Sequence, residues 1–301
     1  MNNVLLTGST GFIGTKLVSA MESKDIYIRA VSREKHPKLE SITCDLRTGI
    51  FSPDLMEGID TVIHIAGIAH DSSKVDEDYY KVNVVATQKL CELAKEHGVK
   101  RFLFVSSVKS GGPNKSGLCA TELDQEEPDG IYGKTKREAE LRLLEIGMNS
   151  KIDVSILRPA LVYGPGAKGN IALMMKGIKK GWFPPFPLVS NKRSLVHVDD
   201  VVRAILFISE SEKAKGEIFI LTDGKSYSTR DIYEFMYKSN DKKVPNWTVP
   251  ELCFKFIAHL SPGIKYKVDK LIGDDYYCSK KLKSIGFQSQ KTLKDINETI
   301  F

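Results

Sequence analysis

Short apolar runs alternate with longer amphipathic stretches through the first 160 residues of this 301-residue chain. The runs are rich in Val, Ile, Leu and Phe, as are strands buried on both faces of a sheet. Between them, apolar residues three or four apart predict helices. This alternation is typical of an α/β fold with a doubly wound parallel sheet. We expect strands at residues 3–7, 26–31, 61–65, 101–107 and 154–158, and helices at 14–23, 76–96 and 132–144.

The pattern changes after residue 160, where a loop rich in Gly and Pro is followed by shorter, lysine-rich segments. Residues 171–180 have the spacing of a helix, and residues 194–209 resemble a strand and a helix that return to the sheet. We therefore expect a nucleotide-binding domain at 1–160, joined by 194–210. A smaller, interwoven α/β substrate lobe would be formed mainly by 161–301.

Composition excludes several classes of protein. With 42% hydrophobic and 27% charged residues, the chain has the make-up of an ordinary globular protein. No apolar run approaches the roughly 18 residues of a membrane span, and no signal peptide is evident, so we expect a cytoplasmic protein. The five cysteines contain no CxxC pair, and His70, Asp71 and Asp76 match no ligand pattern, so we expect no metal.

Charge is unevenly distributed along the chain. Residues 1–150 carry a net charge of −3 and residues 151–301 carry +9. A basic half can meet nucleic acid, an anionic membrane or a phosphorylated small molecule, or can form a solvated lysine-rich surface. Because the sequence has no helix-turn-helix, zinc finger or aromatic-basic platform, we expect no nucleic-acid partner.

Three glycines, Gly8, Gly11 and Gly14, stand between the first expected strand and the first expected helix. Glycines at this spacing permit a tight turn and let the backbone approach a pyrophosphate, while the helix N-terminus supplies free amides. The position in the chain, more than the spacing itself, predicts dinucleotide binding.

The second expected strand ends at Val31-Ser32-Arg33, without the aspartate or glutamate that binds the ribose 2′-hydroxyl of NAD. Ser32 can hydrogen-bond to a 2′-phosphate and Arg33 can pair with it, which favours NADP. The alternative is that Arg33 is solvated and Glu34 serves the ribose of NAD.

Tyr132 and Lys136 lie four residues apart on one face of an expected helix. A neighbouring ammonium lowers the pKa of a phenol from its usual value of about 10, so this pair can move a proton while a cofactor moves a hydride. Ser107 ends the fifth expected strand, where ligands of parallel sheets bind, and can hydrogen-bond to the reacting oxygen. Ser106 is the competing candidate for that role.

These motifs together resemble the extended short-chain dehydrogenase/reductases of the nucleotide-sugar epimerase/dehydratase group, over nearly the whole chain. The resemblance implies a Rossmann fold and the catalytic residues Ser107, Tyr132 and Lys136. It implies a homodimer built on helices 76–96 and 132–144. The cofactor-binding residues that it implies are Gly8, Thr10, Gly11, Phe12, Ile13, Gly14, Ser32, Arg33, Asp45, Leu46, Ala66, Gly67, Asn83, Ser106, Tyr132, Lys136, Pro159 and Val162. The substrate-binding residues are Ser107, Val108, Lys109, Asn170, Phe186 and Arg193, with Arg193 on the diphosphate and Phe186 stacked on the base or packed in the core.

Val108-Lys109 stands where dehydratases of this group have an Asp-Glu pair, so we do not expect dehydration. The segments after Ser107 and Tyr163 resemble reductases of UDP-4-keto-6-deoxy-N-acetylhexosamines. Our leading expectation is hence NADPH-dependent reduction at C4 of such a sugar, for surface polysaccharide synthesis. The alternative is a UDP-sugar 4-epimerase, of the UDP-glucose or UDP-N-acetylglucosamine type, with tightly held NAD. A non-catalytic NADP-binding sensor is the remote alternative.

Overall fold

A computed structural model describes residues 1–69, 76–115, 117–167, 169–259, 261, 265, 268–269 and 271–295. Its strands are β1 (Asn3–Thr7), β2 (Tyr27–Ser32), β3 (Glu40–Thr43), β4 (Thr61–His64), β5 (Arg101–Val105), β6 (Asp153–Pro159), β7 (Leu161–Tyr163), β8 (Leu195–His197) and β9 (Ile218–Leu221). Its helices are α1 (Phe12–Glu22), α2 (Asp76–Tyr80), α3 (Thr87–Glu96), α4 (Gly130–Met148), α5 (Asn170–Lys180), α6 (Val198–Glu210), α7 (Thr229–Lys238), α8 (Glu251–Ala258) and α10 (Lys280–Ser284). Short 3-10 helices cover Pro53–Met56, Val108–Gly111, Glu212–Ala214 and Leu293–Asp295.

Seven strands form one parallel sheet in the order β3-β2-β1-β4-β5-β6-β9. The chain starts in the middle of the sheet at β1, runs to one edge and crosses back through β4 to the other, which is the doubly wound arrangement. The predicted α/β fold with a Rossmann sheet is confirmed. All the strands point the same way, so the ends of β1, β4, β5 and β6 meet at one edge of the sheet.

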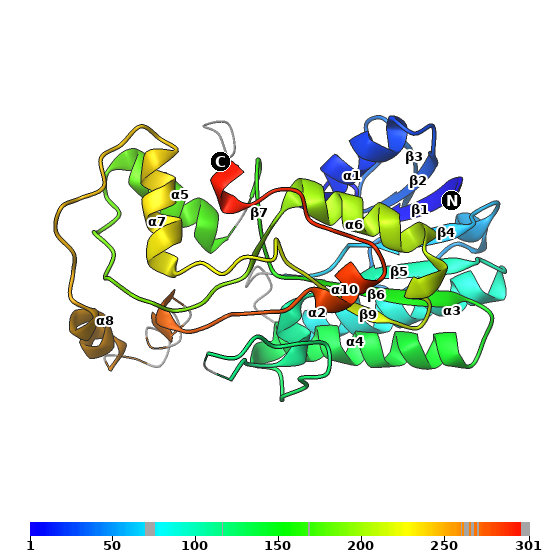
Figure 1. Cartoon of the computed structure of the whole chain (residues 1–301). Helices are drawn as coiled ribbons and strands as arrows, with labels where there is room; N and C mark the ends of the chain where they lie inside the picture. The colour runs from blue at the N-terminus through cyan, green and yellow to red at the C-terminus, as the bar shows by residue number, and fades with distance from the viewer. Residues whose placement is uncertain are drawn as a thin grey trace.

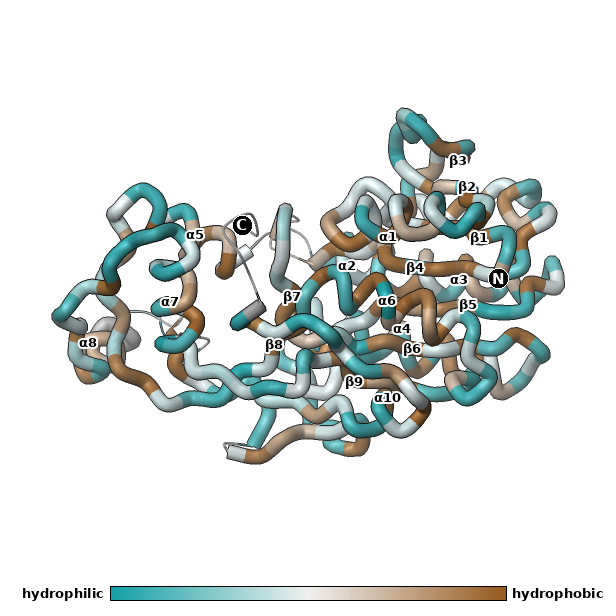
Figure 2. Tube along the Cα trace, turned by 45° about the horizontal axis from the view of Figure 1, so that its top comes forward, coloured by the Kyte–Doolittle hydropathy of each residue, from teal (hydrophilic) through white to brown (hydrophobic). Residues whose placement is uncertain are grey.

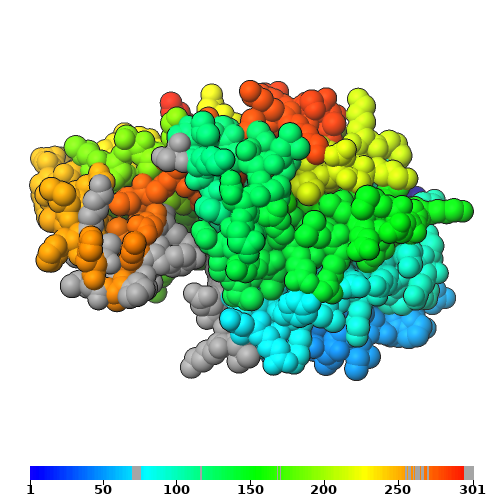
Figure 3. Space-filling model, turned by 90° about the horizontal axis from the view of Figure 1, so that it is seen from below, coloured from blue at the N-terminus to red at the C-terminus, as the bar shows by residue number. Residues whose placement is uncertain are grey.

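Helices cover both faces of the sheet. Figure 1 shows α1 and α6 on one face and α3 and α4 on the other. Side chains alternate along each strand, so Val4 and Leu6 of β1 pack towards α1 and α6, whereas Leu5 packs towards the opposite core. The central strands are therefore hydrophobic on both faces, and the tube in Figure 2 is largely brown along β4. In Figure 3, α4 and residues 117–127 form much of the surface that faces the viewer.

The expected helix at 76–96 contains an unexpected turn. Residues Lys81–Ala86 form a π-helix that connects α2 to α3. The hydroxyl of Thr87 contacts the carbonyl oxygen of Val82 across this wide turn, at 3.5 Å. Asn83 lies inside it and is 1% exposed. Such turns often mark functional sites, and Asn83 is one of the residues predicted to bind the cofactor.

The C-terminal lobe has its own core, formed by α5, α7 and the loops between them, and lies beside the sheet in Figure 1. The segment 194–210 differs from the expectation: its strand, β8, pairs with β7 in a separate two-stranded sheet. Its helix, α6, and Val196 of β8 belong to the core that covers one face of the large sheet. β9 instead supplies the seventh strand, because Phe219 and Leu221 are apolar enough to be fully buried beside β6. Among the described residues, no helix is both long and apolar enough to cross a membrane.

A buried histidine, His64, ties the sheet to α3. Its Nδ1 lies 2.7 Å from the Thr7 hydroxyl and its Nε2 lies 2.8 Å from the Thr87 hydroxyl. The Thr7 oxygen already accepts the amides of Ile65 and Ala66, so its proton points to Nδ1 and the imidazole is neutral. Burial lowers the pKa of His64 to about 3.

We expect the free energy of unfolding to fall as the pH drops from 6.5 towards 3. The unfolded chain takes up a proton at the ordinary histidine pKa of about 6.5, whereas folded His64 does not until about 3. The loss from this residue is about 1.4 kcal/mol per pH unit across that window. Urea unfolding at pH 7.5, 6.5, 5.5 and 4.5 measures it. The variant His64→Gln should show a shallower slope, and an unchanged slope would assign the effect to other groups.

Candidate active site

The loop between β1 and α1 is tightly wound, and glycines stand where its backbone segments come closest to one another. Gly8 has φ +78°, and its carbonyl oxygen accepts the amide of Gly11 at 3.0 Å. A Cβ on Gly14 would lie 2.0 Å from that same oxygen. α1 begins at Phe12 after Gly11, and no side chain caps its first amides. Free amides at a helix N-terminus beside bare backbone fit a dinucleotide pyrophosphate.

A second loop, Ile65–Gly67, follows the end of β4 and lies against the glycine loop; we call the two together the nucleotide cradle. A Cβ on Gly67 would lie 3.0 Å from Oδ1 of Asn83 and 3.3 Å from Nζ of Lys136. Asn83 accepts the amide of Ile68 at 2.8 Å and donates to the Ile68 carbonyl and the Thr135 hydroxyl. Both polar atoms of the Asn83 side chain are therefore hydrogen-bonded within the protein. These bonds link the loop that contains Gly67 to α4.

Two serine hydroxyls next to these loops fit a bound cofactor. Ser9 Oγ, beside Gly8, and Ser106 Oγ, at the end of β5, are buried and have no hydrogen-bond partner among the described residues. Buried hydroxyls without partners are rare in folded proteins, and a nucleotide would supply the missing acceptors. Pro159 ends β6 and Val162 lies in β7, near the same carboxyl edge of the sheet.

The end of β2, where the 2′ position of the adenosine ribose was expected, is polar. The Ser32 hydroxyl donates to the carbonyl oxygen of Glu34 at 2.5 Å, while Arg33 is exposed. Asp45, expected on the adenine side with its neighbour Leu46, accepts hydrogen bonds from Nε and Nη2 of the Arg47 guanidinium. Arg47 first, and Arg33 more weakly, hold the pKa of Asp45 below its ordinary value. This edge thus carries a paired carboxylate and an exposed guanidinium.

Ser107 and Tyr132 come together at the end of β5. Ser107 begins the 3-10 helix Val108–Gly111, and its Oγ accepts the amide of Lys109 at 3.3 Å. Tyr132, in the first turns of α4, lies near enough to Ser107 for that side chain to lower the pKa of its phenol, against the larger rise that burial causes. The structure therefore brings together two of the three predicted catalytic groups, 25 residues apart in the sequence.

Lys136, the third group, does not act on Tyr132 as expected. Burial raises the pKa of Tyr132 to about 12, and the nearby Ser107 side chain offsets only part of that rise. The expectation that Lys136 lowers this pKa is wrong for this structure. The reason is that Nζ of Lys136 donates to the Val105 carbonyl at 3.0 Å and lies 4.4 Å from the centre of the Phe104 ring. Burial lowers the pKa of Lys136 to about 8.

A buried ion pair that was not predicted holds these groups in place. Arg158 of β6 donates through Nε to Glu140 of α4 at 2.9 Å, and both side chains are almost fully buried. Glu140 also accepts the Ser110 hydroxyl at 2.7 Å. The pair thus joins α4, which carries Tyr132, to the 3-10 helix that follows Ser107. The one available signal was the apolar setting of two charged residues, Arg158 in its strand and Glu140 on the inner face of its helix.

The predicted substrate residues fall into two groups. Lys109 and Arg193 both contact Asp275, from opposite lobes. Val108 and Phe186 point into cores instead: Val108 packs with Ala160 and Ile220, and Phe186, 1% exposed, packs on Phe254 and Tyr233. Stacking of Phe186 on a base is therefore wrong for this structure, because neighbouring aromatic rings cover its faces. Asn170 begins α5, and its side chain lies outside the described residues.

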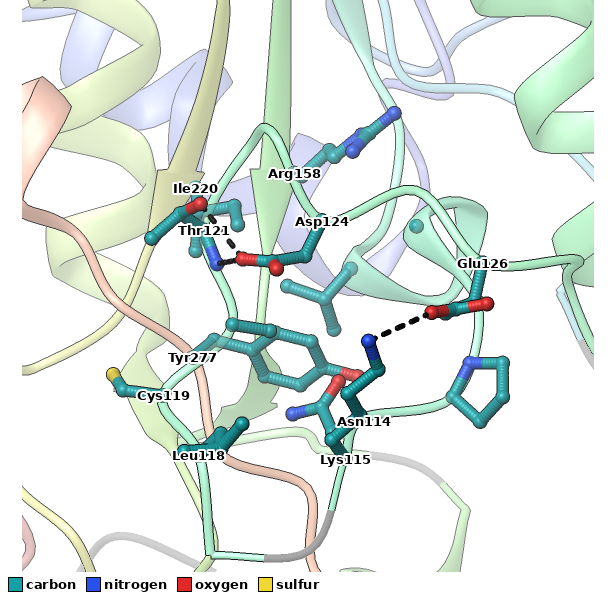
Figure 4. Close-up of a pocket in the computed structure, with 15 residues that line it drawn as sticks. Asn114, Lys115, Leu118, Cys119, Thr121, Asp124, Glu126, Arg158, Ile220 and Tyr277 are labelled. Atoms are coloured by element: carbon teal, nitrogen blue, oxygen red, sulfur yellow. Dashed lines mark hydrogen bonds and ion pairs between the residues drawn. The ribbon is translucent and has the colours of Figure 1, made fainter.

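A cavity of about 200 Å³ lies beside the 3-10 helix, lined by residues from the loop before α4 and by Arg158 and Tyr277. Figure 4 shows that its polar groups already face one another: Lys115 pairs with Glu126 at 3.5 Å, and Thr121 with Asp124. The cavity is separate from the glycine loop of β1. Among the described residues, no group of three or more His, Cys, Asp or Glu side chains could hold a metal ion.

Comparison with known proteins agrees with this geometry. A family model described as the NAD dependent epimerase/dehydratase family matches residues 4–221. The chain belongs to this family, and it is an enzyme of the extended short-chain dehydrogenase type.

Curated relatives match over almost their whole length. A UDP-glucose 4-epimerase of Vibrio cholerae is 33% identical over 306 residues, covering 97% of this chain and 92% of the relative. An N-acetyl-alpha-D-glucosaminyl-diphospho-ditrans,octacis-undecaprenol 4-epimerase of Escherichia coli O157:H7 is 27% identical, with the same coverage.

Solved structures share the fold. The UDP-glucose 4-epimerase of Thermotoga maritima with UDP-glucose superposes with a TM-score of 0.82 at 21% identity, over 99% of this chain and 96% of that one. MoeE5 in complex with UDP-glucose and NAD gives a TM-score of 0.77 at 24% identity, over 98% and 95%.

Proposed function

We propose that this chain is an NAD-dependent 4-epimerase of a nucleoside-diphosphate hexose, with UDP as the expected nucleotide. The observation that carries the proposal is that Ser107 and Tyr132 lie together at the end of β5, with Lys136 one turn further along α4 and next to Gly67. The 4-epimerase names of the two relatives support the C4 position. NAD in the MoeE5 complex supports that cofactor.

Each catalytic side chain has one task in this proposal. The glycine loop and the Gly67 loop would hold NAD, which would supply reversible hydride transfer at C4. Tyr132, once ionised to the phenolate, would take the proton from the C4 hydroxyl and later give it back. Ser107 donates a hydrogen bond to the same sugar oxygen and keeps it oriented. Lys136 supplies a positive charge next to Gly67, in the wall of the nucleotide cradle.

NADPH-dependent 4-keto reduction, the activity favoured by the sequence, is the second candidate. Two observations favour it: Arg33 is exposed at the end of β2, and Tyr132 has a raised pKa, so its phenol is protonated and ready to donate to a ketone. The direction of proton transfer differs between the candidates, whereas the residues are the same.

Cofactor content separates the two candidates. The protein is purified without added cofactor and denatured, and the released nucleotide is identified by mass spectrometry. The protein as purified is also incubated with UDP-glucose alone, and the products are followed by NMR. We expect about one NAD per chain and formation of UDP-galactose without added cofactor. An empty protein that only reduces a 4-keto sugar with NADPH would overturn the proposal in favour of the second candidate.

The variant Arg33→Ala should leave NAD affinity within about twofold of the wild type and weaken NADPH affinity about tenfold. A guanidinium contributes a charge-assisted hydrogen bond to a 2′-phosphate, which NAD lacks. Titration of cofactor-free protein with each nucleotide measures both affinities. The exposed Lys24→Ala variant at the end of α1 is the charge-matched control. Equal weakening of both nucleotides would show that Arg33 supports the loop and does not contact the phosphate.

A further inference from the structure

One stretch of the C-terminal half is basic without interruption. Residues 154–198 contain seven lysines and arginines and no aspartate or glutamate. Three of these lysines, Lys176, Lys179 and Lys180, are exposed on the last two turns of α5. α5 begins at Asn170, the end predicted to bind the substrate, and Lys180 is ten residues further on, about 15 Å away. Binding of the substrate at Asn170 therefore does not account for these charges.

The end of α7 brings a second group of lysines to the same place. Nζ of Lys242 donates to the carbonyl oxygens of Ile178 and Lys179, at 2.8 and 2.7 Å. Figure 1 shows α5 and α7 ending on the same side of the C-terminal lobe. Residues 238–244 contain one acidic residue, Asp241. We call the exposed lysines at these two helix ends the basic patch; they are Lys176, Lys179, Lys180, Lys238, Lys242 and Lys243.

The chain fold holds Trp182 on the basic patch with much of its side chain exposed. Gly181 ends α5 in the left-handed conformation, with φ +74°, and the amide of Trp182 then donates to the carbonyl oxygen of Gly177 at 3.0 Å. The indole lies against Gly177, where a Cβ would be 3.2 Å from Cη2 of the ring. Trp182 is nevertheless 58% exposed, and Leu173, about one turn before Gly177, is 57% exposed. Two large apolar side chains are thus displayed among the lysines.

This combination matches the chemistry of a bilayer surface. Clusters of four to eight lysines or arginines attract anionic lipid headgroups, and Trp rings favour the boundary between headgroups and acyl chains. A nucleic-acid duplex would attract the lysines too, but its phosphate backbone offers nothing apolar to Leu173. The exposed apolar side chains therefore favour the bilayer over nucleic acid.

We propose that the basic patch, with Leu173 and Trp182, is a docking surface for an anionic lipid bilayer. The lysines would contact the lipid phosphates, and the indole would enter the headgroup region. The proposal goes beyond the proposed function and does not depend on it, because the docking surface lies at the end of α5 away from Asn170.

Co-sedimentation of the whole chain with lipid vesicles tests the proposal. Vesicles of phosphatidylcholine alone are compared with vesicles that also contain the anionic lipid phosphatidylglycerol. We expect binding to the anionic vesicles only, and we expect added salt to weaken it, because salt screens exposed charges. The variant Trp247→Phe leaves Trp182 as the one tryptophan. Its fluorescence should shift to shorter wavelength on the anionic vesicles, since the indole would leave water.

Charge-reversal variants locate the surface. Lys176→Glu with Lys243→Glu should weaken binding to the anionic vesicles by at least about tenfold. The matched control is Lys24→Glu with Lys100→Glu, two exposed lysines of the sheet domain, which changes the net charge equally and should stay within about twofold. Trp182→Ala should weaken binding about fivefold. Titration of each variant with NAD verifies that the fold is kept.

Four results would overturn the proposal. They are equal binding to both kinds of vesicle or to neither, equal weakening by the two pairs of charge reversals, an unshifted Trp182 spectrum in the vesicle-bound protein, and retention on duplex DNA but not on vesicles. The last result would make nucleic acid the partner. If a variant does not fold, the vesicle comparison and the spectral shift, which need no charge reversal, still decide the question.

Discussion

Tyr132→Phe is expected to lower kcat for the C4 reaction by about a thousandfold while NAD affinity stays within about twofold. The change removes one oxygen from a side chain whose ring remains in place, so the nucleotide cradle at Gly8, Gly14 and Gly67 keeps its shape. Positioned proton transfer contributes about a hundredfold to ten-thousandfold to the rate of such reactions. Steady-state turnover of UDP-glucose and calorimetric titration with NAD measure the two effects separately.

The control for this variant is Tyr80→Phe. Tyr80 is an exposed phenol at the end of α2, which donates a hydrogen bond to Glu138 and accepts one from Arg142 at the surface. Removing the Tyr80 hydroxyl should change turnover by less than about twofold. Its hydrogen bonds are at the surface, so their loss should hardly affect the stability of the protein. A Tyr132→Phe protein with nearly normal turnover would move the proton-transfer step to another residue and remove the main support for the proposed function.

Much of the sheet could be predicted because its strands are locally distinctive. β1, β4, β5 and β6 are nearly continuous apolar runs, as strands covered on both faces must be. β3 was missed because Glu40–Thr43 lies at the edge, partly exposed, with no apolar run. β9 has a clear apolar run, but a local pattern does not say which sheet a strand joins. That depends on contacts between residues far apart in sequence, here Ile156 with Ile218.

The site divides in the same way. The glycine loop and the Tyr132–Lys136 pair were predictable because each lies within one turn or one helix, where spacing determines proximity. The effect of Lys136 on Tyr132 was not predictable, since it depends on where the ammonium points, and Val105 and Phe104 of β5 decide that. The partnership of Lys109 with Asp275 likewise joins segments that no local pattern connects.

Glu140→Ala is expected to lower the free energy of unfolding by about 3–5 kcal/mol, because it leaves the guanidinium of Arg158 buried without a counter-charge. Arg158 and Glu140 are 2% and 1% exposed, so water cannot easily replace the lost carboxylate. Urea unfolding of cofactor-free protein measures the change, since a bound nucleotide would add its own stabilisation. Glu138→Ala on the same helix removes an exposed partner of Arg142 and should cost less than about 1 kcal/mol.

The double variant Glu140→Leu with Arg158→Met tests the physical cause. Replacing both charges by apolar side chains removes the unpaired guanidinium, so much of the stability lost in Glu140→Ala should return. Turnover should not return with it, because Glu140 also accepts the Ser110 hydroxyl and so holds the 3-10 helix that follows Ser107. A stable but slow double variant would assign the pair a positioning role in catalysis. Equal recovery of stability and turnover would contradict that role and leave the pair a purely structural one.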